Sequence, residues 1–102
     1  MLDEFTQATF APLIGKCFRV HVNASKSVEV LLTEADKLPA HPGRNNQAMR
    51  LEPFVLVFTG PPEFILPQRI YALEQETLGR VEIFLVPIGP DQSGQRYEAI
   101  FN

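Results

Sequence analysis

The side chains best suited to covalent chemistry are one thiol and two imidazoles. Cys17 is the only cysteine of the chain, and His21 and His41 are its only histidines. A thiol activated by an imidazole is a common enzyme nucleophile. Cys17 and His21 are four positions apart in an alternating segment, and on an extended strand this spacing separates them by roughly 13 Å. That is too far for a hydrogen bond, so we expect Cys17 to be a small, half-exposed side chain.

Other patterns that carry chemistry are missing from the sequence. Ser93 lies in a Gly-Pro-Asp-Gln-Ser-Gly turn and lacks the flanking glycines of a nucleophile elbow. One cysteine and two histidines do not give a zinc-binding spacing, and no glycine-rich phosphate loop is present. We therefore predict a protein that is not an enzyme and that holds neither a metal nor another cofactor.

The composition indicates one globular domain over residues 1–102. Hydrophobic residues make up 45% of the 102 residues, which suffices for a single core. The net charge is −3, and the nine lysines and arginines are scattered along the chain. A protein that binds nucleic acid through bulk charge is normally basic, so we expect no nucleic-acid partner.

Cysteine usage and hydropathy bear on the compartment. A single cysteine cannot form an intramolecular disulfide, which fits a reducing environment. The acidic start has no cationic segment followed by an apolar one, so we expect no signal peptide. No apolar run approaches the ~20 residues that span a bilayer. We predict a cytoplasmic protein without a membrane partner.

The elements that would position these residues are short strands with alternating apolar side chains. Turn signals rich in Gly, Pro, Asn and Asp separate them. The predicted strands are Phe18–Val22, Val28–Thr33, Leu51–Thr59, Ile70–Glu74, Arg80–Val86 and Gln95–Phe101. Six or seven strands joined mostly as hairpins predict an all-β fold, either a small antiparallel barrel or a two-layer sandwich. Pro87 cannot donate to a ladder and marks an edge or a bulge.

Two segments fall outside this pattern. The first is one short N-terminal helix over about Phe10–Ile14, with Thr9 as N-cap, Gly15 after its end, and an earlier turn starting at Asp3 or Thr6. Its apolar side would plug one end of the sheet. The second is Glu34–Arg50, which is rich in Pro, Gly and Asn and predicts a long loop.

Several apolar features favour a contact with another chain. Phe64, Ile65 and Leu66 lie between prolines, and Val55 and Val57 make the strand after Pro53 apolar on both faces. These valines would lie under the N-terminal helix or meet a partner. The last strand ends the chain, and an unprotected edge strand pairs with other chains. The weak interface candidates are Phe64, Ile65, Leu66, Tyr71, Arg96 and Tyr97.

These features leave two kinds of function open. The first is a non-enzymatic structural or protein-interaction module that contacts another protein or associates with itself. The alternative is a module that binds a small ligand or a glycan in the mouth of the barrel, with Tyr71, Tyr97 and Arg96 as contacts.

Longer motifs carry a resemblance to a known family. They include Glu52-Pro-Phe-Val-Leu-Val-Phe-Thr-Gly-Pro61, Leu78-Gly-x-x-Glu-Ile-Phe-Leu-Val-Pro-Ile-Gly89 and Tyr97-Glu-Ala-Ile-Phe-Asn102. Over nearly its whole length the chain resembles a small bacterial family of uncharacterised all-β domains, often encoded near phage-tail-collar-like proteins. It departs from that family at Arg69 and at Gln75-Glu76. The resemblance implies no activity and no catalytic residues, and it favours an accessory role in a phage-tail-like assembly.

Overall fold

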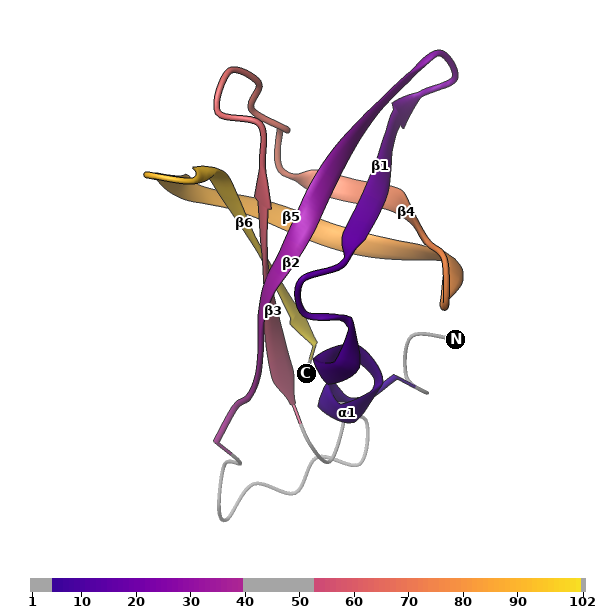
Figure 1. The fold of residues 1–102 in the computed structure, drawn as a ribbon, viewed down its shortest axis with the longest axis vertical. Coiled ribbons are helices and arrows are strands. Elements are labelled where there is room, and N and C mark those ends of the chain that lie inside the picture. Colours follow the sequence, from indigo (N-terminus) through magenta and orange to yellow (C-terminus); the bar gives the residue numbers. More distant parts are fainter. Residues whose placement is uncertain (1–4, 40–52, 102) are drawn as a thin grey trace.

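The computed structural model describes residues 5–39 and 53–101, which form a short helix, a 3₁₀ turn and six strands (Figure 1). The elements in chain order are α1 (Gln7–Phe10), η2 (Ala11–Leu13), β1 (Cys17–Asn23), β2 (Lys26–Lys37), β3 (Phe54–Gly60), β4 (Arg69–Gln75), β5 (Gly79–Asp91) and β6 (Gly94–Phe101). The predicted all-β class with one short N-terminal helix is confirmed.

The six strands close into an antiparallel barrel in the order β1-β2-β3-β6-β5-β4. Two meanders, β1-β2-β3 and β4-β5-β6, meet along the β3–β6 and β1–β4 pairings. The long strands β2 and β5 each pair with two neighbours in turn. The first half of β2 pairs with β1 and the second half with β3, whereas the first half of β5 pairs with β4 and the second half with β6. In Figure 1, β5 crosses behind β2 and β3. Of the two predicted architectures, the barrel is the one that forms.

Each of the two long strands has a bulge near the point where it passes from one partner strand to the other. The register of β2 shifts at Thr33, and that of β5 shifts between Pro87 and Gly89. Such a bulge bends a strand and increases its twist. The Thr33 hydroxyl donates to the carbonyl of Val57 on β3 at 3.0 Å, which holds the first bend. The bulge predicted from Pro87 is therefore present.

Because of the first bend, β2 is longer than the sequence indicated. Glu34–Lys37 were assigned to a loop, and this assignment is wrong, since they continue β2 and pair with β3. The bulge explains the error, because the extra residue interrupts the apolar alternation between Leu32 and Ala35. The rest of the predicted loop, from residue 40, lies outside the described residues.

The helix begins earlier than predicted, at Gln7, with Thr6 as its N-cap. Thr6 and Thr9 form a reciprocal capping box, with the Thr6 backbone N–H donating to the Thr9 hydroxyl at 3.0 Å. This interaction uses Thr9 as the third helical residue instead of as the cap. Pro12 falls in the 3₁₀ turn, and Gly15 at φ +90° leads the chain into β1.

One end of the barrel is closed by the side chains of this helix, as expected. Phe10 is fully buried, and its ring lies 5.8 Å from the rings of both Phe54 and Phe101. Phe54 and Phe101, which are register partners on β3 and β6, stack with their centroids 4.5 Å apart. Four phenylalanines, counting Phe5 at 5.6 Å from Phe10, thus seal the end that lies beside the helix.

The connection between β3 and β4 crosses the other end. It must do so because these two strands are not neighbours in the barrel. Leu66 is fully buried beneath it, and the Tyr97 hydroxyl accepts from the Leu66 backbone N–H at 2.8 Å and donates to the Phe64 carbonyl. The Tyr71 hydroxyl donates to the carbonyl of Pro67. Both ends of the barrel are therefore held by side chains that reach its interior.

Closure of the barrel removes the docking edge expected at the end of the chain. β6 pairs with β3 from Phe101 to Gln95 and with β5 from Glu98 to Gly94. A strand bonded on both sides offers no free ladder to another chain. The interpretation of β6 as an unprotected edge is wrong, because β3, which is distant in sequence, pairs with the side of β6 that the β5–β6 hairpin leaves open.

Candidate functional site

The thiol of Cys17 and the imidazole of His21 lie four positions apart on β1. Cys17 is exposed at the start of β1. His21 Nε2 donates to Glu74 Oε1 on β4 at 2.6 Å, so the imidazole is engaged by a carboxylate. His41 lies outside the described residues.

A hollow of about 480 Å³ opens on the outer surface where β1 and β4 separate. Cys17, Arg19, Glu29 and Glu74 are among its lining residues. Glu29, Arg19, Glu74 and Arg80 are successive register partners on β2, β1, β4 and β5, so their charges alternate across four strands. Within residues 5–39 and 53–101, no group of three metal-ligating side chains is present. The hollow has the features of a charge ladder.

Glu74 gives this ladder a dependence on pH. The hydrogen bond from His21 holds the pKa of Glu74 below its ordinary value of 4.5. A carboxyl group whose pKa falls on folding adds stability above its ordinary pKa, and this stability is lost as the pH falls through the folded value.

We expect Glu74→Gln to lower the thermal midpoint slightly at about pH 6 and to have progressively less effect as the pH falls below about 4. Thermal unfolding of the wild type and the variant across this range measures the difference. Glu63→Gln, at an exposed position in the β3–β4 connection, is the control and should show a smaller change with pH. A difference between wild type and Glu74→Gln that stays constant down to about pH 3 would contradict the assignment.

The six interface candidates from the sequence separate into buried and exposed groups. Leu66, Tyr71 and Tyr97 are at most 2% exposed and belong to the core. Burial raises the pKa of both tyrosines, and their hydroxyls hold the β3–β4 connection. These three side chains do not reach the surface.

The remaining three candidates reach solvent, but at different places. Phe64 is half-buried under the Lys26 ammonium group, 4.0 Å from the ring centroid. Ile65 is 57% exposed. Arg96 lies on β6 near the β5–β6 turn, with its Nε 3.7 Å from Asp91 Oδ2. The structure does not bring the six candidates together into one surface.

A different set of apolar side chains does form a continuous surface, on the outside of the barrel. Phe84 on β5 faces outward, since Val81, Ile83 and Leu85 fill the interior. Its register partner on β4 is Ile70. We call this surface the apolar band, and it consists of Val55, Ile70, Phe84, Val86 and Ile100.

The register connects the members of the band. Val86 follows Phe84 by two positions on the same face, at roughly 7 Å, and pairs with Glu98. Ile100 follows Glu98 by two positions on the same face of β6, just beyond the last β5–β6 pair, and it pairs with Val55 on β3. The band thus crosses β4, β5, β6 and β3. Ile70 is 62% exposed, Ile100 54% and Phe84 48%, so most of its large side chains face solvent.

The band accounts for Val55, one of the two outward valines that make β3 apolar on both faces. Val55 and Val57 point outward, away from the N-terminal helix, since Phe54, Leu56 and Phe58 occupy the interior. Val57 is only 8% exposed because it lies between its register partners Glu34 and Glu98. Val55 remains half-exposed.

The sequence contained a signal for the band in strand β5. Phe84 and Val86 alternate with the core residues of β5, so this strand is apolar on both faces. An apolar outer face is unusual for an antiparallel strand with a solvated side. The signal does not show that Ile70 and Ile100 lie beside these residues, because that depends on pairing between distant strands.

The comparisons with known proteins give one result. A family model described as a domain of unknown function, DUF6916, matches residues 5–101. Neither the curated proteins nor the solved structures contain a match to the chain. In the part of the chain that the structure describes, no helix has the length and hydropathy needed to cross a membrane.

Proposed function

The chain belongs to the DUF6916 family, and we propose that this domain is a non-enzymatic module that binds a partner protein on its apolar band. The observation that carries the proposal is the exposure of Ile70, Phe84 and Ile100 on the outer faces of the neighbouring strands β4, β5 and β6. Contiguous exposed apolar surface on a folded domain commonly marks a protein-interaction site. An exposed phenylalanine flanked by isoleucines has the composition of an interface core.

The barrel beneath the band supports this role because it is a closed platform. Both ends are plugged, and each strand that carries the band has a hydrogen-bonded neighbour on each side of the closed sheet. A preorganised surface binds with a smaller loss of conformational entropy. None of the band residues is among those that line the hollow at the β1–β4 seam.

The small-ligand alternative receives no comparable support. Its proposed contacts were Tyr71, Tyr97 and Arg96 at an open barrel mouth. Both tyrosines are buried, with their hydroxyls bonded to the connection that crosses this end. Arg96 lies at the outer surface beside Asp91.

In its finer form, the proposal makes the partner a component of a phage-tail-like assembly in the bacterial cytoplasm. The resemblance to a bacterial family encoded near phage-tail-collar-like proteins supports the assembly. The single cysteine supports the reducing compartment.

Affinity capture with band variants tests the proposal. The tagged full chain would be used as bait in an extract of the source organism, and proteins that bind in stoichiometric amounts would be identified and quantified. Phe84→Ser combined with Ile70→Ser should reduce recovery of the partner at least about tenfold, as expected for central interface residues.

The matched control is Ile65→Ser combined with Ile14→Ser, which removes two exposed isoleucines outside the band. It should leave recovery unchanged. Circular dichroism would establish that both variants are folded. Equal recovery with the band variant and the control would overturn the proposal.

A further inference from the structure

The apolar band has carboxylates along its borders. Glu98 is the register partner of Val86, and Asp36 is the register partner of Val55. Glu34 lies across Val57 from Glu98. On the β4–β5 side, Glu82 precedes Phe84 by two positions on the same outer face. The band thus combines apolar side chains with four acidic ones.

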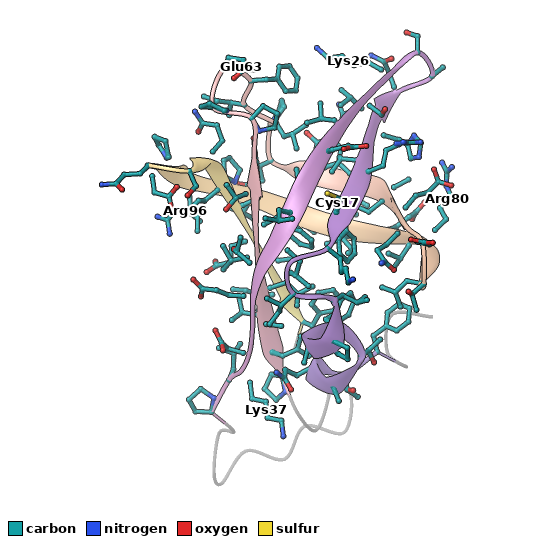
Figure 2. The ribbon with its side chains drawn as sticks, in the orientation of Figure 1. Cys17, Lys26, Lys37, Glu63, Arg80 and Arg96 are labelled. Atoms are coloured by element: carbon teal, nitrogen blue, oxygen red, sulfur yellow. The ribbon has the colours of Figure 1, made fainter. Side chains whose placement is uncertain are left out.

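The outer-face arginines beside these carboxylates have other partners. Arg80 and Arg96 are the outer-face arginines of β5 and β6, and Figure 2 shows them on opposite sides of the molecule. Arg80 is the register partner of Glu74, and Arg96 lies beside Asp91. Among the described residues, none makes a salt bridge with Glu34, Asp36, Glu82 or Glu98. The border therefore holds four carboxylates outside any salt bridge of the described residues, against two arginines on the same strand faces.

This charge bears on which partner fits the band. In a symmetric pair of identical chains the same patch meets itself, so the acidic border of one copy would face the acidic border of the other. Juxtaposed like charges disfavour such a contact. A segment with apolar side chains flanked by lysines or arginines would cover the band and neutralise its border.

We propose that the partner presents such a cationic amphipathic segment to the apolar band. This inference rests on the proposed function, since it assigns a chemistry to the partner of the same surface. The apolar side chains of the segment pack on Phe84, Ile70 and Ile100. Its cations lie against Glu98, Glu34, Asp36 and Glu82. The acidic border accelerates association with a cationic partner and makes that association sensitive to salt.

A designed peptide pair tests the chemistry directly. One 14-residue amphipathic peptide carries leucines on one face and lysines on the other, and the second has glutamate at every lysine position. We expect the lysine peptide to shift backbone amide resonances of the full-length ¹⁵N-labelled chain in β3, β4, β5 and β6. The glutamate peptide should bind at least about tenfold more weakly. Equal affinities, or shifts confined to other strands, would overturn the inference.

Charge-neutralising variants test the border. Glu34→Gln combined with Glu98→Gln should weaken binding of the lysine peptide about fivefold at low salt. Raising the salt concentration should reduce the difference between this variant and the wild type. The control, Glu63→Gln combined with Glu76→Gln, removes the same charge from two exposed positions outside the band and should bind as the wild type does. If both pairs weaken binding equally, net charge alone acts and the inference fails.

The natural partner separates failure of the inference from failure of the proposed function. A partner lost with the Phe84→Ser and Ile70→Ser variant, but kept with Glu34→Gln and Glu98→Gln at every salt concentration, would overturn the cationic segment and leave the proposed function standing. A partner unaffected by the band variant would overturn both. Loss of the partner with the band variant and with the charge variant would support both the proposed function and the cationic segment.

Discussion

Replacement of Gly94 by alanine is expected to destabilise the barrel by about 4 kcal/mol or more, or to prevent folding. Gly94 begins β6 with a φ of +145°, where a side chain is strained. A Cβ at this position would also overlap the carbonyl oxygen of Gly60. That oxygen belongs to backbone that the β3–β6 ladder holds in place, since Gly60 pairs with Gln95. Urea unfolding followed by circular dichroism measures the loss.

Gly79→Ala is the matched control, because Gly79 also has a positive φ, of +79°, but a Cβ there would meet nothing within 4 Å. It should cost only the strain of a left-handed backbone, about 1–2 kcal/mol. The difference between the two variants reports the clash with Gly60 together with the additional backbone strain at a φ of +145°. Similar urea midpoints for the two variants would show that the close approach of Gly94 to Gly60 does not affect the free energy of unfolding.

Truncation of Phe10 to alanine is expected to cost about 3–4 kcal/mol, because it leaves a cavity among closely packed rings. Phe10 is fully buried and lies 5.6 Å from Phe5 and 5.8 Å from Phe54 and Phe101, measured between ring centroids. The same urea titration would measure the loss. The prediction concerns the plug at the helical end of the barrel, which the binding surface does not include.

Ile14→Ala provides the comparison in the same segment, since Ile14 is 45% exposed. Its loss should stay below about 1 kcal/mol. Comparable losses at the two positions would mean that α1 does not act as a plug. Partner binding by the Phe10→Ala variant should be retained wherever the protein remains folded, because Phe10 faces the interior.

The local patterns of the sequence predict much of this fold. Val81, Ile83 and Leu85 alternate with outward residues, as do Tyr97, Ala99 and Phe101, and both sets fill the interior. Alternation reports which face of a strand is buried. It does not report which strands close the structure, so a barrel and a sandwich were equally compatible with it. That choice depends on the pairing of β1 with β4, over short segments distant in sequence.

The candidate site was harder to predict for a related reason. Tyr71 and Tyr97 were predicted as interface or ligand contacts, although a buried tyrosine hydroxyl also needs a polar partner. That partner is instead the backbone of the β3–β4 connection, whose path over the barrel follows from the topology. The outward position of Phe84 was visible in the alternation of β5. Its neighbour Ile70 becomes visible only once the register is known.

The division of the barrel into two meanders has a consequence for its synthesis on the ribosome. When translation has passed Gly60, β1, β2 and β3 are complete, but the strands that cover the sides of β1 and β3 are β4 and β6. A nascent chain at this stage exposes two open edges and an apolar inner face. Such a species is prone to aggregate or to engage chaperones. The barrel can close only after β6 has left the ribosome. The release of β6 therefore determines when the open edges and the apolar inner face are covered.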